Sequence, residues 1–259
     1  MDDFGPLLRH WRTVRRLSQL DLSLAANVSS KHVSFLETGR ARPSREMIGL
    51  LSVTLDIPLG DRNLLLQAAG YKECFSCMDI DLPEMEPVRR ALNYSLNNHN
   101  PYPALVMDQE WNMLMCNEGY QRLFTHITSL RPNMPVTQNI LEIFFDPNGL
   151  RPLVKNWEDV ASLFLQRLHR ERILYQNTKS DLLERLLAYP NIPSAWREVD
   201  LSRSAYPMAC VTLQLGPGEI EIFSSLSMFG TAIDATMQRL IIEQYFPVDA
   251  ESARILREI

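Results

Sequence analysis

The chain has 259 residues, 46% of them hydrophobic, and carries a formal net charge of −5. This length is sufficient for two domains, and the hydrophobic share is ordinary for a globular protein. No uninterrupted apolar run approaches the length of a membrane span, and the N-terminal residues are acidic, unlike those of a signal peptide. We therefore expect a cytoplasmic protein that does not enter a membrane.

The charge is unevenly distributed along the chain. Residues 1–72 hold 10 Lys and Arg against 7 Asp and Glu, a net charge of +3, whereas residues 73–259 hold 16 against 24, a net charge of −8. A mildly basic first part followed by an acidic body is compatible with phosphate binding at one end of the molecule. The four cysteines, including the closely spaced Cys74 and Cys77, are too few for a disulfide framework at this length.

Residues 18–38 have the pattern of two short helices joined by a tight turn. Ser18 and Asp21 have the spacing of a helix N-cap, and Ser29 can cap the second helix. Asn27 lies at the bend and tolerates the left-handed backbone conformation. The inward-facing apolar set is Leu22, Ala26, Val28, Val33 and Leu36. The pattern predicts a helix-turn-helix whose second helix enters the DNA major groove; the alternative is an ordinary helical hairpin with polar outer faces.

Three more helices are predicted around this motif. Apolar residues at helical spacing indicate a first helix over Phe4–Leu17 and another over about Arg45–Leu55. Gly39 can end the second motif helix, and Ser44 can cap the helix after it. A fifth helix is expected to begin at Asp61 and to reach Ala69.

About the first 70 residues resemble the DNA-binding domain of the XRE (Cro/C1-type) repressor family. The matching stretches are Leu17-Ser18-Gln19, Val28-Ser29, Leu36-Glu37-Thr38-Gly39-Arg40 and Pro43-Ser44, whereas Asn27 and Ser23 replace the usual glycine and alanine. The resemblance implies an all-α, five-helix, lambda-repressor-like domain in which Gln19 and Arg40 hold phosphates. Lys31 and Ser34 are the first candidates for contacts to DNA bases. The full set of expected DNA-contacting residues is Gln19, Ser29, Ser30, Lys31, His32, Ser34, Arg40 and Arg42.

The second part of the sequence mixes strand and helix patterns. Two apolar runs, Ala104–Met107 and Trp111–Cys116, flank a polar turn and predict a β-hairpin, after which Asn117 can cap a helix. Met208–Leu215 and Glu219–Met228 predict a second hairpin that closes an antiparallel sheet. Further helices are expected over Glu84–Asn97, Trp157–Gln176 and Ser180–Tyr189.

This strand-and-helix order resembles the opening of a PAS-type sensor domain. The blocks Asn139–Val154, Asn156-Trp157, Phe229–Asp234 and Ile242–Asp249 further resemble the MmyB-like ligand-binding domain. The resemblances imply an α+β chain with a helix-turn-helix DNA-binding domain at residues 1–73, a linker at 74–83 and a PAS-like ligand-binding domain at 84–259. They also imply a bacterial one-component transcription regulator that senses a small apolar ligand, such as a fatty acid or its thioester.

Ligand contacts are expected among the many Met and aromatic residues of the body, which adapt to apolar guests but also form ordinary cores. An acidic ligand would need a partner for its carboxylate, because an unpaired buried charge is costly. Arg122 and Arg151 are the cationic candidates. The full expected set is Tyr94, Met107, Asn117, Tyr120, Arg122, Phe124, Phe144, Arg151 and Phe164.

Catalysis is not expected, because none of the five histidines belongs to a triad or metal-ligand pattern and no glycine-rich phosphate loop occurs. We expect no metal and no cofactor beyond the bound ligand. The expected partners are double-stranded operator DNA and a second copy of the chain in a homodimer. Two alternatives stay open: a body that only dimerises or binds a protein, and a haem or redox sensor that uses His126, His169 or the Cys74/Cys77 pair.

Overall fold

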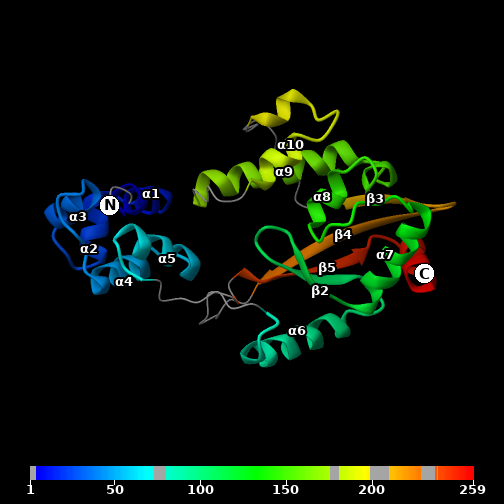
Figure 1. Ribbon diagram of the computed structural model, residues 1–259, viewed down its shortest axis with the longest axis horizontal. Coiled ribbons are helices and arrows are strands. Elements are labelled where there is room, and N and C mark those ends of the chain that lie inside the picture. Colours follow the sequence, from blue (N-terminus) through cyan, green and yellow to red (C-terminus); the bar gives the residue numbers. More distant parts are fainter. Residues whose placement is uncertain (1–3, 73–79, 176–180, 199–209, 229–236, 238) are drawn as a thin grey trace. The chain divides into compact units, whose positions relative to one another are not determined.

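The computed structural model describes residues 4–72, 80–175, 181–198, 210–228, 237 and 239–259 (Figure 1). These residues form two compact units: the first holds the described residues up to Met85 together with residues 237 and 239, and the second holds those of Glu86–Met228 and Leu240–Ile259. The first unit, here called the head, is helical, and the second, here called the body, combines an antiparallel sheet with helices. The predicted α+β class is confirmed. Most of the predicted linker lies outside the described residues.

Five helices form the head, as predicted. They are α1 (Phe4–Val14), α2 (Gln19–Ala25), α3 (Ser30–Glu37), α4 (Arg45–Thr54) and α5 (Leu59–Ala68). Two of the predicted boundaries are wrong. α1 ends at Val14 because Arg16, with φ 57°, takes the left-handed conformation, and α5 begins directly after Pro58 rather than at Asp61. Proline fits that position because it lacks the N–H that a first helical turn leaves unpaired.

The turn between α2 and α3 follows from local side-chain chemistry. Ser18 and Asp21 form a reciprocal capping box at the start of α2. Asn27 has φ 52° at the bend, and the Ser29 hydroxyl accepts a hydrogen bond from the His32 amide at 3.1 Å. These contacts confirm the predicted helix-turn-helix and set where α3 begins.

The head has its own apolar core, to which all five helices contribute. Its fully buried members include Leu8, Leu22, Leu36, Leu51 and Leu65. α1 and α3 approach so closely that a Cβ atom added at Gly5 would lie 2.4 Å from the carbonyl oxygen of Glu37. Only glycine permits this spacing.

The body contains five strands and six labelled helices among its described residues. In chain order they are α6 (Glu86–Asn98), β1 (Ala104–Met107), β2 (Met113–Cys116), α7 (Glu118–Leu130), α8 (Ile140–Phe145), α9 (Trp157–Tyr175), α10 (Leu182–Leu187), β3 (Cys210–Leu215), β4 (Gly218–Met228), β5 (Ile241–Pro247) and α12 (Ala250–Glu258). Short 3₁₀ turns occur at Pro83–Met85, Arg151–Leu153 and Ser194–Arg197. Asn117 caps α7 through the Tyr120 amide, as predicted.

The sheet has the strand order β2-β1-β5-β4-β3, and every described pair of neighbouring strands is antiparallel. The two predicted hairpins are the pairs β1–β2 and β3–β4. The central strand β5, which joins the hairpins, was not among the predicted strands. Its omission matters because β5 carries Glu243 and Tyr245 on the face that also presents Ile241 to the core.

Helices cover both faces of the sheet. Figure 1 shows α9 and α10 on one side of the sheet and α6 on the other. The main core of the body combines strand residues such as Leu105 and Ile222 with helix residues such as Phe145, Trp157 and Leu165. The cavity described below lies between the sheet and the helices α7, α8 and α9.

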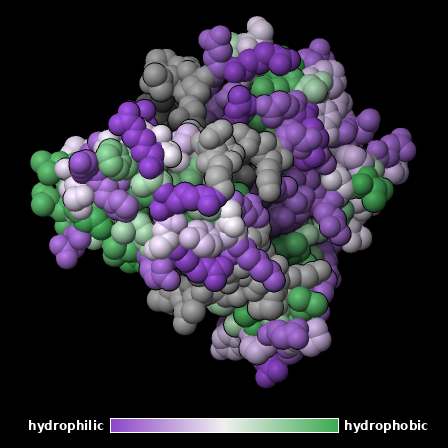
Figure 2. All heavy atoms as spheres, turned by 60° about the vertical axis from the view of Figure 1, so that its left-hand side comes forward, coloured by the Kyte–Doolittle hydropathy of each residue, from purple (hydrophilic) through white to green (hydrophobic). Residues whose placement is uncertain are grey.

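No helix among the described residues is long and apolar enough to cross a membrane. The face drawn in Figure 2 is mainly hydrophilic, and its hydrophobic side chains lie in separate patches. In the head, exposed apolar side chains include Leu20 and Leu24 of α2 and Val53 of α4.

Candidate functional sites

α3 presents a polar face, and the buried side chains on its other side anchor the helix in the head core. Val33 and Leu36 are buried against the head core, whereas Ser30 and Lys31 are exposed. His32 and Ser34 are half-buried. The candidate base-contacting residues therefore lie on a helix whose opposite side is fixed by packing.

Phe35 belongs to the accessible part of α3 but was not among the predicted contacts. Its ring is half-buried and lies 5.5 Å from the Lys31 ammonium group, an i,i+4 cation–π contact. The aromatic residue four positions after a lysine was the sequence signal for this pair.

The predicted phosphate contacts lie at the two ends of the motif. Arg40 and Arg42 are exposed in the loop that follows the left-handed Gly39. The Ser29 hydroxyl is engaged in capping α3, so its first role is structural. Gln19 also has an internal partner, because its side-chain amide donates to Glu37 at 2.8 Å. An amide nitrogen carries two protons, which leaves Gln19 a second donor for a phosphate.

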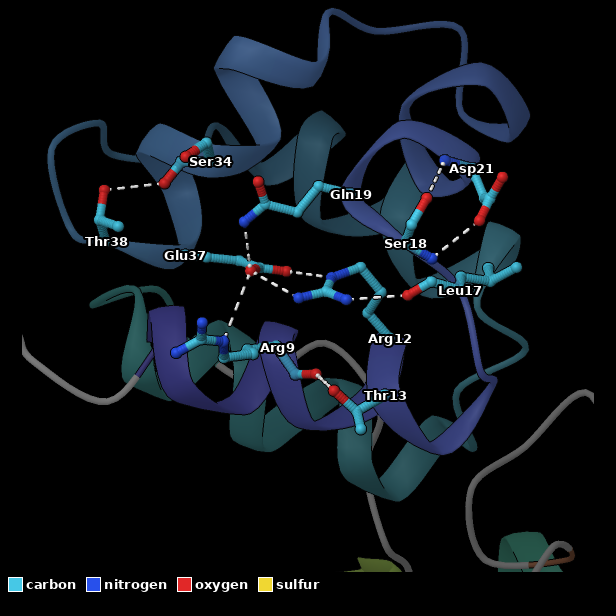
Figure 3. A network of polar contacts seen from close by, with 10 residues as sticks. All are labelled: Arg9, Arg12, Thr13, Leu17, Ser18, Gln19, Asp21, Ser34, Glu37 and Thr38. Atoms are coloured by element: carbon cyan, nitrogen blue, oxygen red, sulfur yellow. Dashed lines mark hydrogen bonds and ion pairs between the residues drawn. The ribbon is translucent and has the colours of Figure 1, made fainter.

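Glu37 is the centre of a polar network that ties the first three helices together. In Figure 3 its carboxylate lies between Gln19, Arg12 and Arg9. Arg12 donates from Nε to Oε1 at 2.5 Å and from Nη2 to Oε2 at 2.9 Å, whereas Arg9 lies 3.9 Å away. The Glu37 side chain is only 2% exposed. A buried carboxylate held by a bidentate arginine fixes α3 against α1 and α2.

The surroundings of Glu37 favour its ionised form. Burial raises the pKa of the carboxyl, but hydrogen bonds from Arg12 and Gln19, together with the charges of Arg12 and Arg9, more than offset this effect. The net result is a lowered pKa. Glu37 therefore stays charged at neutral pH and orders the C-terminal end of α3.

The body contains a cavity of about 140 Å³. Side chains from β3, β4, β5, α7, α8 and α9 line it, and most of them are aliphatic or aromatic. A cavity of this volume encloses a benzene-sized group, so a longer hydrocarbon ligand would extend beyond it. An apolar enclosure with a few polar groups is the usual design of a small-molecule site.

Four of the predicted ligand residues line this cavity: Tyr120, Phe124, Phe144 and Phe164. The Tyr120 and Phe124 rings stack with centroids 5.9 Å apart, and the Phe144 and Phe164 rings meet edge to face at 5.3 Å. These pairs come from α7, α8 and α9, so the cavity wall depends on how these helices pack.

Three other predicted ligand residues lie elsewhere, and we do not assign them to the ligand. Tyr94 is 74% exposed on α6, because it points away from the buried side of that helix. Met107 is fully buried in β1 and does not line the cavity. Asn117 caps α7 and also binds backbone atoms of Ala104 and Tyr102, so its side chain is committed to the fold.

The two predicted cationic partners also lie outside the cavity lining. Arg122 donates to the Pro101 carbonyl at 3.0 Å. Arg151 donates to the Pro190 carbonyl at 2.7 Å, and its guanidinium lies 3.8 Å from the centroid of the Trp157 ring. Neither arginine is placed to neutralise a carboxylate in the cavity.

The polar end of the cavity was missed by sequence reasoning. It consists of Glu243 and Tyr245 on β5, Ser224 on β4 and Tyr120 on α7. The Tyr245 hydroxyl donates to Glu243 Oε2 at 2.9 Å, and Ser224 also hydrogen-bonds the Glu243 side chain. Ser224 is paired directly with Tyr245 across the two strands. The run Ile241–Pro247, rich in aromatic and β-branched residues, was the available signal.

Burial dominates the electrostatics of this end. It raises the pKa of Glu243, although hydrogen bonds from Ser224 and Tyr245 and the charge of Arg167 act in the opposite direction. Burial also raises the pKa of Tyr120 and of Tyr245. All three groups are therefore biased towards their neutral, protonated forms.

Evidence for the haem or redox alternative is limited to single residues. His169 Nε2 lies 3.0 Å from the Trp196 carbonyl, so this ring nitrogen already has a backbone partner. Cys74 and Cys77 lie outside the described residues. Within the described part of the chain, no group of three or more His, Cys, Asp or Glu residues could hold a metal ion.

Comparison with protein families gives two matches that follow the two units. Residues 8–61 match a helix-turn-helix model, and residues 88–259 match the model of the MmyB-like transcription regulator ligand binding domain. No curated protein matches the chain. The second match covers more than half of the sequence and includes every residue that lines the cavity. The chain therefore belongs to the MmyB-like transcription regulators, with a helix-turn-helix for DNA followed by a ligand-binding domain.

Proposed function

We propose that this regulator binds operator DNA through α3 and changes that binding when an apolar molecule, such as a fatty-acid derivative, occupies the cavity. The observation that carries the proposal is the mostly apolar cavity with one polar end, inside a domain of ligand-binding type. A polar end fixes the orientation of a guest, and the apolar wall supplies affinity by removing hydrocarbon from water.

On the DNA side, α3 enters the major groove with its exposed residues towards the base edges. Lys31 donates to guanine acceptors, while Ser30 and Ser34 bind base or phosphate atoms. The Phe35 ring beside Lys31 offers an apolar contact for a thymine methyl group. Arg40 and Arg42 bind phosphates and thereby position the helix.

We further propose that the protein acts as a homodimer. A helix-turn-helix protein with two-fold symmetry binds half-sites about one helical turn, roughly 34 Å, apart. The ligand regulates such a dimer only if it binds more tightly when the heads have one arrangement than when they have the other.

The proposal is tested with purified full-length protein. Native mass spectrometry and solvent extraction report a co-purifying apolar molecule, and selection from fragmented genomic DNA reports the operator. We expect a preferred fragment whose affinity changes when the ligand is removed and restored. Equal binding to all duplexes would contradict the DNA-binding half of the proposal. Specific DNA binding with no effect of any apolar compound would favour the alternative in which the body only dimerises or binds a protein.

A cavity-filling substitution separates ligand binding from folding. Val211 lines the cavity and is half-buried, so Val211→Phe narrows the space available to a guest. Val248→Phe is the matched control, because Val248 is 43% exposed and does not line the cavity. We expect only Val211→Phe to weaken the response of DNA binding to the ligand.

A further inference from the structure

The cavity is strongly asymmetric in polarity. Besides the indole of Trp111, the lining residues with polar side-chain atoms are Tyr120, Ser224, Glu243 and Tyr245, and Glu243 is the one carboxyl group among them. On β5, Glu243 and Tyr245 are two residues apart and face the same side of the sheet. Ser224 of β4 lies beside Tyr245 in the strand register. Three strand residues and one helix residue thus form a single polar end.

We propose that this polar end binds a neutral hydrogen-bonding head group, such as a hydroxyl, ester or amide, and discriminates against the ionised carboxylate of a free fatty acid. The inference rests on the proposed function and specifies the chemistry of the ligand. The Glu243 carboxyl donates its proton to an oxygen of the head group. The Tyr245 hydroxyl already donates to Oε2 of the same carboxyl, which fixes its orientation.

A ligand carboxylate would meet a second carboxyl group instead of a cation. Neither lysine nor arginine occurs in the described lining of the cavity. A free acid could share the Glu243 proton, but the pair would still hold one negative charge in an apolar site whose described lining has no cation, and a further proton removes that cost. Its binding is therefore linked to proton uptake more strongly than that of a neutral head group.

The charged and titratable groups around Glu243 support this assignment. On α7 and β5 the neighbours are Tyr120 and Tyr245, both with raised pKa values. The charge of Cys116 on β2 contributes to the raised pKa of Tyr120, and burial raises the pKa of Cys116 itself. The cation whose charge lowers the pKa of Glu243 is Arg167 of α9. Its Nε donates to Glu171 at 2.7 Å, and its guanidinium lies 4.8 Å from the centroid of the Trp111 ring. Arg167 is thus engaged by other partners.

The test uses three probes with the same hydrocarbon tail: octanol, octanoate and octylammonium. Their affinities for delipidated full-length protein are measured by calorimetry at about pH 8 and about pH 5.5, both above the ordinary carboxyl pKa. Octanol carries no charge, so its affinity should change much less between the two pH values than that of octanoate. Octanoate should bind roughly tenfold or more weakly than octanol at the higher pH and should approach it at the lower pH.

The variant Glu243→Gln removes the ionisable group but keeps the shape of the side chain. It should bind octanoate more tightly relative to octanol than the unaltered protein does, because no second carboxyl faces the ligand, and it should reduce the difference between their pH profiles. Glu110→Gln is the matched control, because Glu110 is exposed in the β1–β2 turn and does not line the cavity. Circular dichroism checks that both variants are folded, and the three-probe comparison on the unaltered protein stands without them.

Different results overturn different statements. Equal affinities of octanol and octanoate at the higher pH would overturn the head-group assignment and leave the ligand cavity intact. Tighter binding of octylammonium than of octanol would also overturn it, because Glu243 would then act as a carboxylate. Binding of none of the probes would contradict the apolar ligand site itself, and with it both proposals.

Discussion

Glu37 and Glu243 are both buried carboxyl groups, yet their surroundings act in opposite directions. Glu37 accepts hydrogen bonds from Arg12 and Gln19, and its pKa is lowered. Among the described residues, Glu243 accepts hydrogen bonds from the neutral hydroxyls of Tyr245 and Ser224, and its pKa is raised. Charged partners thus give Glu37 a structural role in the head. Glu243 has no charged group among its described hydrogen-bond partners, which suits it to a binding site.

Glu37→Gln should destabilise the head by about 2 kcal/mol, because Arg12 loses its charged partner in a half-buried site. The lowered pKa gives the sign of the pH dependence. The Glu37 contribution is present above the ordinary carboxyl pKa of about 4.5 and disappears as the pH falls through the lower folded-state value. Thermal unfolding across the acid range should show a smaller loss in the variant. The exposed Glu46→Gln is the control, and an equal effect of both substitutions would contradict the prediction.

Glu243→Gln should have the opposite effect on the ligand-free protein. A folded-state pKa above the unfolded value means that stability decreases as the pH rises from about 4.5 through the raised value. The variant lacks this penalty, so its melting temperature should exceed that of the unaltered protein at neutral and higher pH and match it in acid. A lower melting temperature at high pH would show that the carboxylate stabilises the fold.

At the scale of single elements, we expect α3 to contact bases and the loop after it to hold phosphates. Lys31→Ala should change sequence preference as well as affinity, because Lys31 lies on the exposed face of α3. Arg40→Ala should weaken all sequences alike and should lower the slope of affinity against salt by about one unit. Titrations of specific and random duplexes over a range of salt concentrations measure both quantities. Indistinguishable profiles for the two variants would contradict this division.

The crossing of α1 and α3 depends on Gly5. Gly5→Ala places a methyl group 2.4 Å from a backbone oxygen of Glu37, so the helices must separate. We expect a loss of about 1–3 kcal/mol in head stability and a weaker affinity for DNA. Gly49→Ala is the matched control, since no atom lies within 4 Å of a Cβ placed there and alanine favours a helix. Chemical denaturation followed by circular dichroism compares the two.

At the scale of the whole molecule, the proposed regulation is a coupling between two binding sites. Thermodynamic linkage requires that operator DNA change the affinity for the ligand by the same factor by which the ligand changes the affinity for DNA. Octanol titrations with and without saturating operator DNA should therefore reproduce the factor found in DNA-binding assays. Random duplex of equal length is the control. Unequal factors would show that the two equilibria are not linked as a simple pair.

Local sequence patterns predicted much of the structure because their causes are local. Ser18, Asn27, Ser29, Ser44 and Asn117 all take the cap or turn positions expected of them, because capping and left-handed turns involve only a few adjacent residues. The two hairpins were likewise predictable from apolar runs flanking polar turns. β5 was missed because its two partners are distant in sequence and no hairpin turn marks it.

Local patterns along the chain were thus sufficient to predict the two-part organisation, the helix-turn-helix and the aromatic character of the cavity wall, as seen in Tyr120, Phe124, Phe144 and Phe164. The fold in three dimensions selects the polar groups that meet the cavity. It places Arg122 and Arg151 outside the cavity lining. It also brings Glu243 and Tyr245 together with Ser224 and Tyr120. The physical reason is that strand pairing joins residues far apart in the chain, and burial then sets their protonation.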